Sequence, residues 1–275
     1  MSSKKHLMRD AGLDLREADR TPDTPQTQSP AYRLAFADPD FLCQDALRPV
    51  RRQLELLKTE MGMDAEGIRS TIVLFGGARI PAPDATDGKP PAIAAMAPYY
   101  EEARRFAYQI TQCGARGENV IVTGGGPGVM EAGNRGAHEA GGVSVGLNIV
   151  LPHEQAPNAY VTPELSFNFH YFAIRKMHFL LRARALAIFP GGFGTMDELF
   201  ESLTLIQTGR MEQVPVLLFG RDYWTRLVDW DMLVEIGTIS PEDLDLFRFV
   251  ETAEEALDVI DTWPLSGRRG GIPGR

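Results

Sequence analysis

Short apolar runs alternate with longer amphipathic stretches through most of the chain. The runs TIVLF, NVIVT, VSVGL, ALAIF and VPVLLF predict buried strands at residues 71–75, 119–123, 143–147, 185–189 and 214–219. Helical periodicity between and after these runs predicts helices at residues 99–113, 127–140, 172–184, 195–208, 223–236 and 253–262. Strands that alternate with helices predict an α/β fold: a doubly wound, Rossmann-like parallel sheet with helices on both faces.

The chain before Thr71 lacks this alternation. Residues 1–37 include the polar, proline-rich TPDTPQTQSP, and their small apolar content predicts a disordered tail. Apolar residues at roughly helical spacing from Asp40 to Met61 predict an N-terminal helical extension. The proline- and alanine-rich stretch Ile80–Met96 predicts a long surface loop, and the final SGRRGGIPGR a loose end. We therefore expect one folded domain at residues 38–275.

Composition narrows the range of partners. The chain has 275 residues, 44% of them hydrophobic, which suffices for one sizeable core or two small ones. Its formal net charge of −9 gives no general attraction to nucleic acid or anionic membranes. No apolar stretch approaches the ~20 residues of a membrane helix, and MSSKKHLMRD lacks the apolar core of a signal peptide. We expect a cytoplasmic protein with neither nucleic acid nor membrane as a partner.

Two predicted strands end in glycine clusters that run directly into helices. The first cluster, within 121–137, holds Gly124, Gly125, Gly126 and Gly128; the second, within 187–201, holds Gly191, Gly192 and Gly194, followed by Thr195. Such turns let the backbone approach a ligand and expose the N–H groups of the first helical turn, which favours phosphate. Neither cluster matches G-x-G-x-x-G or a P-loop, and tight turns are the alternative. Two clusters beyond the carboxyl ends of one sheet favour the phosphate site.

Basic residues precede the second cluster. Arg175, Lys176, Arg182 and Arg184 fall on one predicted helix, and the seven-residue spacing of Arg175 and Arg182 places them on one face. A solvated basic face is the common alternative. However, Lys176 is the only lysine in the predicted strands and helices from Thr71 onward, and we count it among the residues expected to bind the substrate phosphate. An arginine such as Arg175 can clamp a phosphate or a carboxylate.

Carboxylates follow the second cluster. Thr195 and Glu198 fit a capping box, a structural explanation for Glu198, and Glu201 shares the face of Glu198. Two carboxylates beside a phosphate loop would repel the phosphate, but they suit a neighbouring sugar. Hydrolysis of an N-glycosidic bond passes through a cation-like ribose. A carboxylate can stabilise this positive charge or activate the water that attacks the ribose.

The R-K pair at 175–176, followed by PGGFGTMDE at 190–198, resembles the LOG family, whose members are often misnamed lysine decarboxylases. The resemblance covers roughly residues 71–260. It implies a cytokinin riboside 5′-monophosphate phosphoribohydrolase or a related nucleotide nucleosidase, with Arg175 and Glu198 as the catalytic pair. It also implies that Gly191, Gly192, Gly194 and Thr195 hold the phosphate, that Glu201 contacts the ribose or the base, and that Gly124–Gly128 line the same pocket. Family members form dimers, so we expect a homodimer or an assembly of dimers.

Several stretches resemble the longer, type II-like branch of the family. These are the turn FGGAR at 75–79, the GGGPGVMEA loop, the N-terminal extension and the segment 146–158. We expect Arg79 of this turn to add a cation to the pocket, and an ordinary surface arginine in a loop is the alternative. No histidine or cysteine spacing indicates a metal, and nothing beside Lys176 suits a pyridoxal phosphate, so we expect no cofactor.

We therefore expect a nucleotide N-glycosidase with a Rossmann-like nucleotide-binding catalytic domain. Its reaction would hydrolyse a purine nucleoside 5′-monophosphate, including one with an N6-substituted adenine, to the free base and ribose 5-phosphate. The alternative is a protein of the same fold that binds a nucleotide or a phosphorylated cofactor without turnover.

Overall fold

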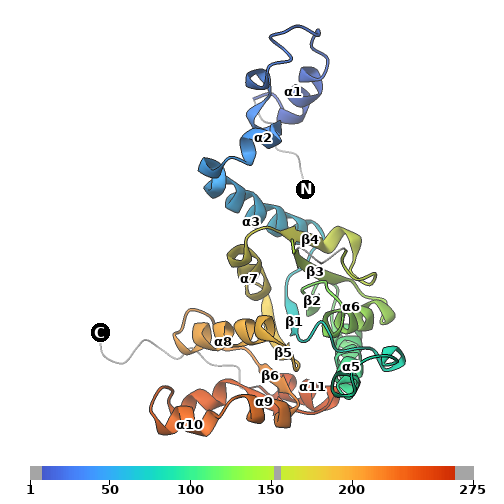
Figure 1. Ribbon diagram of the computed structural model, residues 1–275, viewed down its shortest axis with the longest axis vertical. Helices are drawn as coiled ribbons and strands as arrows, with labels where there is room; N and C mark the ends of the chain where they lie inside the picture. Colours follow the sequence, from blue (N-terminus) through green and yellow to red (C-terminus); the bar gives the residue numbers. More distant parts are fainter. Residues whose placement is uncertain (1–7, 152–155, 264–275) are drawn as a thin grey trace. The chain divides into compact units, whose positions relative to one another are not determined.

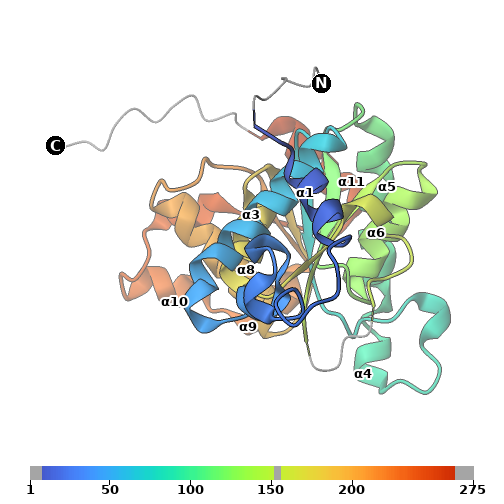
Figure 2. The ribbon, with the colours of Figure 1, turned by 90° about the horizontal axis from the view of Figure 1, so that it is seen from above.

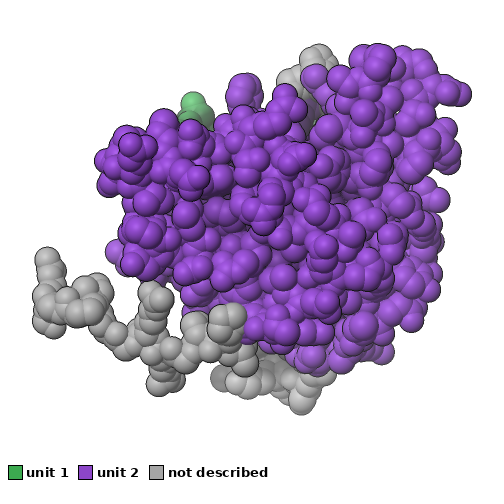
Figure 3. All heavy atoms as spheres, turned by 90° about the horizontal axis from the view of Figure 1, so that it is seen from below, with its two compact units in different colours: residues 1–57 green, residues 58–275 purple. Residues whose placement is uncertain are grey.

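The computed structural model describes residues 8–151 and 156–263, and the expected loose end at 266–275 lies outside them. The chain divides into two compact units, Met1–Leu57 and Lys58–Arg275, which are coloured separately in Figure 3. The division falls inside a helix, whereas the sequence placed the start of the folded domain at residue 38. Across the described residues, no helix is both long and apolar enough to cross a membrane.

The first unit is built from short helices. Helix α1 spans Ala11–Ala18 within the predicted tail; the carboxylate of Asp10 accepts hydrogen bonds from the N–H groups of Gly12 and Leu13, and no residue of the helix is buried. The single helix predicted from Asp40 to Met61 is wrong. It is two helices, α2 (Pro39–Leu42) and α3 (Arg48–Ala65), because Pro49 cannot continue a helix from the preceding turn.

The second unit holds a seven-stranded sheet, counted over the described residues, in the order β4-β3-β2-β1-β5-β6-β7 (Figure 1). Every neighbouring pair is parallel, which confirms the predicted fold class. The five predicted strands correspond to β1, β2, β3, β5 and β6, whereas β4 and β7, at the two edges, are not among the predicted strands. The strands span Thr71–Phe75 (β1), Val120–Thr123 (β2), Ser144–Ile149 (β3), Ser166–Phe169 (β4), Ala183–Ile188 (β5), Val216–Phe219 (β6) and Arg248–Val250 (β7).

Helices cover both faces of this sheet, as predicted (Figure 2). Alternate residues of β1 enter different cores: Ile72 and Leu74 pack with α5, α6 and α11, whereas Val73 and Phe75 pack with α7 and α8. Trp224 and Trp230, from α9 and α10, join the second core. The helices span Ala97–Cys113 (α5), Val129–Glu139 (α6), Phe172–Leu180 (α7), Phe193–Gln207 (α8), Arg221–Leu227 (α9), Trp230–Glu235 (α10) and Ala253–Thr262 (α11).

Three predicted elements need correction. The helix predicted at 172–184 ends at Leu180, so Arg182 and Arg184 lie outside α7, and β5 begins at Ala183. The helix predicted at 223–236 is interrupted before α10, where Asp229 accepts a hydrogen bond from the N–H of Met232 and starts a new helix. The loop predicted at Ile80–Met96 contains a short helix, α4 (Pro91–Ala94), which begins at a proline.

The strand order creates one break in the winding of the sheet. From β1 the chain proceeds through β2, β3 and β4 on one side and then crosses to β5, β6 and β7 on the other. The strands β1 and β5 are neighbours, and the chain leaves them toward opposite sides of the sheet. This place is a switch point, where parallel sheets leave a crevice for a ligand.

Candidate active site

A cavity of about 880 Å³ opens at this switch point. Its volume lies within the range of about 300–1,000 Å³ that small-molecule sites occupy. The loops after β1, β2 and β5 line it together with the first turns of α7 and α8. Its polar and glycine lining includes Gly76, Gly77, Arg79, Gly124, Arg175, Gly191, Gly192, Gly194, Thr195, Asp197, Glu198 and Tyr223.

The second glycine loop forms one wall of the cavity and opens directly into α8. Gly191 packs against Thr195 so closely that a Cβ on Gly191 would lie 2.1 Å from the Thr195 Oγ1. The predicted capping box is wrong: α8 begins at Phe193, the N-cap is Gly192, and no side chain caps the first turn. The uncapped N–H groups at this end of the helix favour an anion in the cavity.

Glu198 brings a buried carboxyl group to the same wall. Its exposed fraction is only 7%, yet it lines the cavity. Burial raises the pKa of Glu198 to about 7, although the charges of Lys176 and Arg175 act in the opposite direction. The negative charges of Glu201 and Asp197 contribute further to the rise. A carboxyl group with a pKa near neutrality is suited to proton transfer.

Arg175 reaches the cavity from α7 and is held on several sides. Its Nε donates a hydrogen bond to the carbonyl oxygen of Leu147 over 2.7 Å, and its guanidinium carbon lies 5.2 Å from the ring centre of Phe179. A Cβ on Gly124 would lie 2.6 Å from the Nη2 of Arg175. The glycine at the end of β2 therefore leaves the space that the guanidinium group occupies, which links the first glycine loop to the catalytic pair predicted from the sequence.

Lys176 and Glu201, two further predicted site residues, bind each other and do not line the cavity. The Nζ of Lys176 lies 2.8 Å from a carboxylate oxygen of Glu201 and 2.9 Å from one of Asp197. Burial lowers the pKa of Lys176, but the hydrogen bonds to Glu201 and Asp197 outweigh it and leave the pKa raised. Both residues thus lie outside the cavity lining, on the helices that carry Arg175 and Glu198.

The rest of the first glycine loop is engaged in backbone packing. Gly125 and Gly128 adopt positive φ angles of 72° and 70°. The side chain of Asn158 donates hydrogen bonds to the carbonyl oxygens of Gly125 and Gly126, over 3.1 and 3.0 Å. A Cβ on Gly128 would approach the carbonyl oxygen of Gly77 within 2.4 Å. Among the four glycines of this loop, Gly124 alone borders the described cavity, and the others fix the loop in place.

The structure also adds residues that the sequence analysis did not single out. Gly77 donates its N–H to the carbonyl oxygen of Pro190 over 2.9 Å, and the hydroxyl of Tyr223 donates to the carbonyl oxygen of Gly191. The FGGAR turn was a usable signal for Gly77, whereas nothing local marked Tyr223. Arg79, exposed at this turn, lines the cavity. An apolar wall comes from Ile80, Pro90, Ala92, Ile93 and Met96.

Arg182 lies away from this site. Its guanidinium group binds the carboxylates of Glu60 and Asp64, both over 2.9 Å, and the carbonyl oxygen of Ile68. The predicted common face with Arg175 is therefore wrong, because α7 ends before Arg182 and the chain turns into β5.

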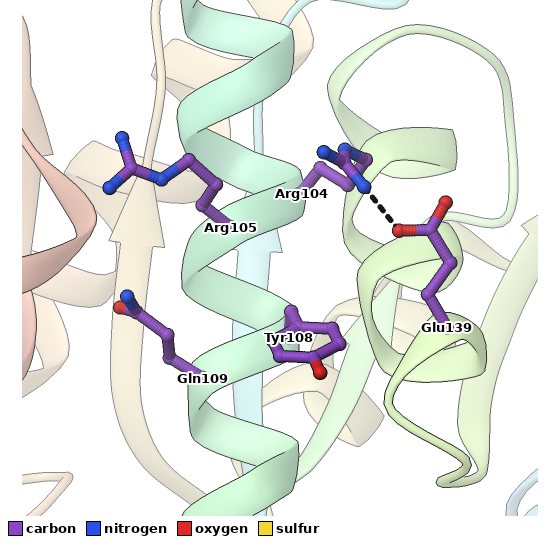
Figure 4. Close-up of a pocket in the computed structure, with 5 residues that line it drawn as sticks. All are labelled: Arg104, Arg105, Tyr108, Gln109 and Glu139. Carbon is purple, nitrogen blue, oxygen red and sulfur yellow. Dashed lines mark hydrogen bonds and ion pairs between the residues drawn. The ribbon is translucent and has the colours of Figure 1, made fainter.

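A second, smaller cavity of about 290 Å³ lies beside α5 (Figure 4). Acidic side chains already bind both of its arginines: Arg104 pairs with Glu101 and Glu139, and Arg105 with Glu102 and Glu254. These ion pairs leave less positive charge for an anionic ligand than the cavity at the switch point offers.

The fold and the large cavity together define a Rossmann-like α/β protein with an uncapped helix terminus at its switch point. A family model described as "Possible lysine decarboxylase" matches residues 130–260. The probable cytokinin riboside 5′-monophosphate phosphoribohydrolase LOGL5 of Oryza sativa subsp. japonica is 30% identical over 171 residues, which cover 61% of this chain and 67% of the relative. The chain belongs to this family, the LOG family.

Two further similarities accompany this assignment. The cytokinin riboside 5′-monophosphate phosphoribohydrolase LOG3 of Arabidopsis thaliana is 26% identical over 152 residues, which cover 54% of this chain and 69% of the relative. A solved structure, a target of the Northeast Structural Genomics Consortium, is 22% identical with a TM-score of 0.47, over 70% of this chain and 98% of that one.

Proposed function

We propose that the protein hydrolyses the N-glycosidic bond of a purine nucleoside 5′-monophosphate and releases the free base and ribose 5-phosphate. The observation that carries this proposal is the buried Glu198 carboxyl, which shares a cavity with the uncapped first turn of α8 and with Arg175. The names of the two relatives describe enzymes that act on a riboside 5′-monophosphate.

In this proposal the phosphate group binds at the first turn of α8. Gly194 and Thr195 offer backbone N–H groups there, and the helix dipole adds partial positive charge. Arg79, exposed in the loop that follows β1, supplies a full positive charge to the same cavity. Lys176 is less suited to this role, since two carboxylates already hold its ammonium group.

The carboxylate of Glu198 then serves the bond that breaks. As the bond from C1′ to the base nitrogen lengthens, positive charge develops on the ribose, and a nearby carboxylate stabilises it. The same carboxylate takes a proton from the water that attacks C1′, while the base leaves with the bonding electrons. The Glu198 carboxyl then passes this proton to the departing base and returns to its ionised form. Arg175, held by Leu147 and Phe179, orients the substrate for this step.

The apolar wall of the cavity supports a purine that carries an apolar group. Pro90, Ala92, Ile93 and Met96 come from the segment between β1 and α5 and present carbon surface to the cavity. A base with an N6 substituent could bury that substituent here and gain from its removal from water.

The test incubates the purified protein with a panel of nucleoside 5′-monophosphates and the matching nucleosides, and measures free base and ribose 5-phosphate. We expect turnover of at least one purine monophosphate and a far lower kcat/KM for its nucleoside, which lacks the phosphate. Tight nucleotide binding by calorimetry with no product from any member would favour the binding protein without turnover. Equal kcat/KM for nucleotide and nucleoside would refute the phosphate site.

Two variants then assign the roles within the site. Glu198→Gln keeps the shape but cannot take a proton, so kcat should fall by about 10²–10⁴-fold while nucleotide binding persists. Arg175→Ala should lower both binding and turnover, because it removes a group that orients the substrate. Near-normal turnover by Glu198→Gln would show that another group performs the chemistry.

A further inference from the structure

Lys176 occupies an unusual place for a lysine: it is mostly buried, and its ammonium group joins α7 to two carboxylates of α8, the helix that carries Glu198. Its side chain is 16% exposed, while its partners Asp197 and Glu201 are 59% and 36% exposed. Both partners lie on α8, one residue before and three residues after Glu198. The ammonium group is thus fixed by two carboxylates beside a third, and Glu198 is the most buried of the three.

The polar groups around Glu198 divide into those that line the cavity and those that do not. Arg175 from α7, Arg79 from the loop after β1 and Tyr223 from α9 share the cavity with Glu198. Lys176 from α7, with Glu201 from α8, lies outside the cavity lining, and Asp197 on α8 borders the cavity. Positive charge on Lys176 therefore acts on Glu198 both before and after a ligand enters, and it opposes the penalty that burial places on the carboxylate.

We infer that Lys176 is a positioning residue whose ammonium group, held by Asp197 and Glu201, favours the ionised form of the buried Glu198 carboxyl. This inference rests on the proposed function as far as the role of Glu198 in catalysis is concerned. It replaces contact with the phosphate, the role that the sequence predicted for Lys176. The competing explanation is a structural tie between α7 and α8 with no influence on Glu198.

Three variants separate these explanations. Lys176→Met removes the charge and preserves the length of the side chain, Lys176→Arg preserves the charge, and Glu201→Gln removes a negative neighbour while Asp197 still holds Lys176. Titration of the Glu198 carboxyl by NMR in unliganded, carboxyl-labelled protein gives its midpoint, and Glu198→Gln assigns the signal. The measurement does not depend on turnover.

We expect the midpoint of Lys176→Met to move to higher pH by about one pH unit, that of Lys176→Arg to stay near the original, and that of Glu201→Gln to move to lower pH. The acid limb of the kcat/KM profile should move with it, so that Lys176→Met loses about tenfold in kcat/KM below its new midpoint and recovers at higher pH. Lys176→Arg is the rescue that a simple loss of packing would not predict.

An unchanged midpoint in Lys176→Met, with a lower melting temperature or a pH-independent loss of activity, would overturn the inference in favour of the structural tie. If Lys176→Met does not fold, equal midpoints in the parent and Glu201→Gln overturn it. If the midpoint of the Glu198 titration moves in the variants as expected, but the protein hydrolyses none of the nucleotides, the inference about ionisation is supported and the proposed function fails. If the protein hydrolyses a nucleotide, but the midpoint of the Glu198 titration is the same in the parent and the variants, the proposed function is supported and the inference is overturned.

Discussion

At the scale of single residues, the ionisation of Glu198 is opposed by burial and favoured by nearby cations. A carboxyl group that is 7% exposed is costly to ionise, and the nearby cations Lys176 and Arg175 only partly offset this cost. The outcome is a pKa of about 7, near the pH at which an acid–base group is most effective. Two consequences follow, one for the rate of the reaction and one for the stability of the fold.

The rate should depend on pH through this carboxyl. If the carboxylate is the active form, kcat/KM rises with pH and levels off above about 7. A pH profile from 5 to 9, with the best nucleotide from the panel, measures this. A rate that falls as pH rises through 7 would show that Glu198 acts in its protonated form instead.

Stability should depend on pH in the opposite sense. Because the pKa of Glu198 rises from 4.5 in the unfolded chain to about 7 in the folded one, the native state binds the proton more tightly, and its stability falls as pH rises between these values. Above pH 7 the full cost is on the order of 3 kcal/mol. Glu198→Gln avoids it and should be more stable than the parent at pH 8.

Urea denaturation at pH 8 and at pH 4.5 provides the measurement, and the two proteins should differ little at the lower pH. Asp197→Asn is the matched control, since the side chain of Asp197 is 59% exposed and should show no comparable gain. Lower stability of Glu198→Gln at pH 8 would mean that the carboxylate makes stabilising contacts that outweigh its burial.

At the scale of elements, the sequence predicted those parts whose signal is local. The five central strands are largely apolar, because helices bury both faces, and such runs stand out in a sequence. The edge strands do not. In β4, Ser166 and Asn168 are exposed while Phe167 and Phe169 are buried, and β7 has only three residues.

Helix ends were the least predictable elements. Pro49 and Asp229 were available signals for a break before α3 and before α10, and both were overlooked. The start of α8 was assigned to Thr195 on a matching motif, yet the chain begins the helix at Phe193. A motif of four residues cannot decide between two starts on the same turn, because the glycines around it permit either.

The site shows the same division between local and distant signals. The glycine clusters, Arg175, Glu198 and Arg79 were found from motifs, and the structure places Arg175, Glu198, Arg79 and four of the predicted glycines around one cavity. Which carboxylates Lys176 binds depends on how α7 packs against α8. The apolar wall depends on where a long segment folds. Neither is encoded in local spacing, so neither could be read from one sequence.

The contact between Gly124 and Arg175 gives a prediction about two elements, the end of β2 and α7. Gly124→Ala places a methyl group 2.6 Å from the Nη2 of Arg175 and 2.8 Å from the Sδ of Met130. A displaced guanidinium should lower kcat/KM by up to about 10²-fold, because a shift of about 1 Å can cost that much. Steady-state kinetics measure the loss.

The double variant Gly124→Ala with Met130→Ala is the control. It removes the overlap with the sulfur and leaves the overlap with the arginine, so the loss should persist. Recovery of activity in the double variant would assign the effect to Met130 and not to Arg175.

At the scale of the whole molecule, α3 carries an apolar stripe that is exposed to solvent in a single copy of the chain. Val50, Leu54 and Leu57 lie at spacings of four and three residues and are 37%, 49% and 54% exposed. We expect another copy of the chain to cover this stripe, in a homodimer or an assembly of dimers.

The paired change Leu54→Glu and Leu57→Glu should shift the protein to a smaller species in light scattering at assay concentration. Met232→Glu with Ile236→Glu adds the same charge to another exposed apolar pair, at α10, and should leave the mass unchanged. A parent protein that is already monomeric contradicts the expectation.

The segment 80–96, the part of the connection from β1 to α5 that follows Arg79, has a consequence for how such enzymes diversify. Its apolar residues border the cavity, but it contributes none of the glycines of the two loops, neither Arg175 nor Glu198, and no strand of the sheet. Insertions, deletions or exchanges there can remodel the walls around a bound base while the apparatus that breaks the bond stays intact. The residues that select the base and the residues that cleave the bond thus lie on separate stretches of chain. Relatives can therefore diverge in substrate specificity and keep the catalytic activity.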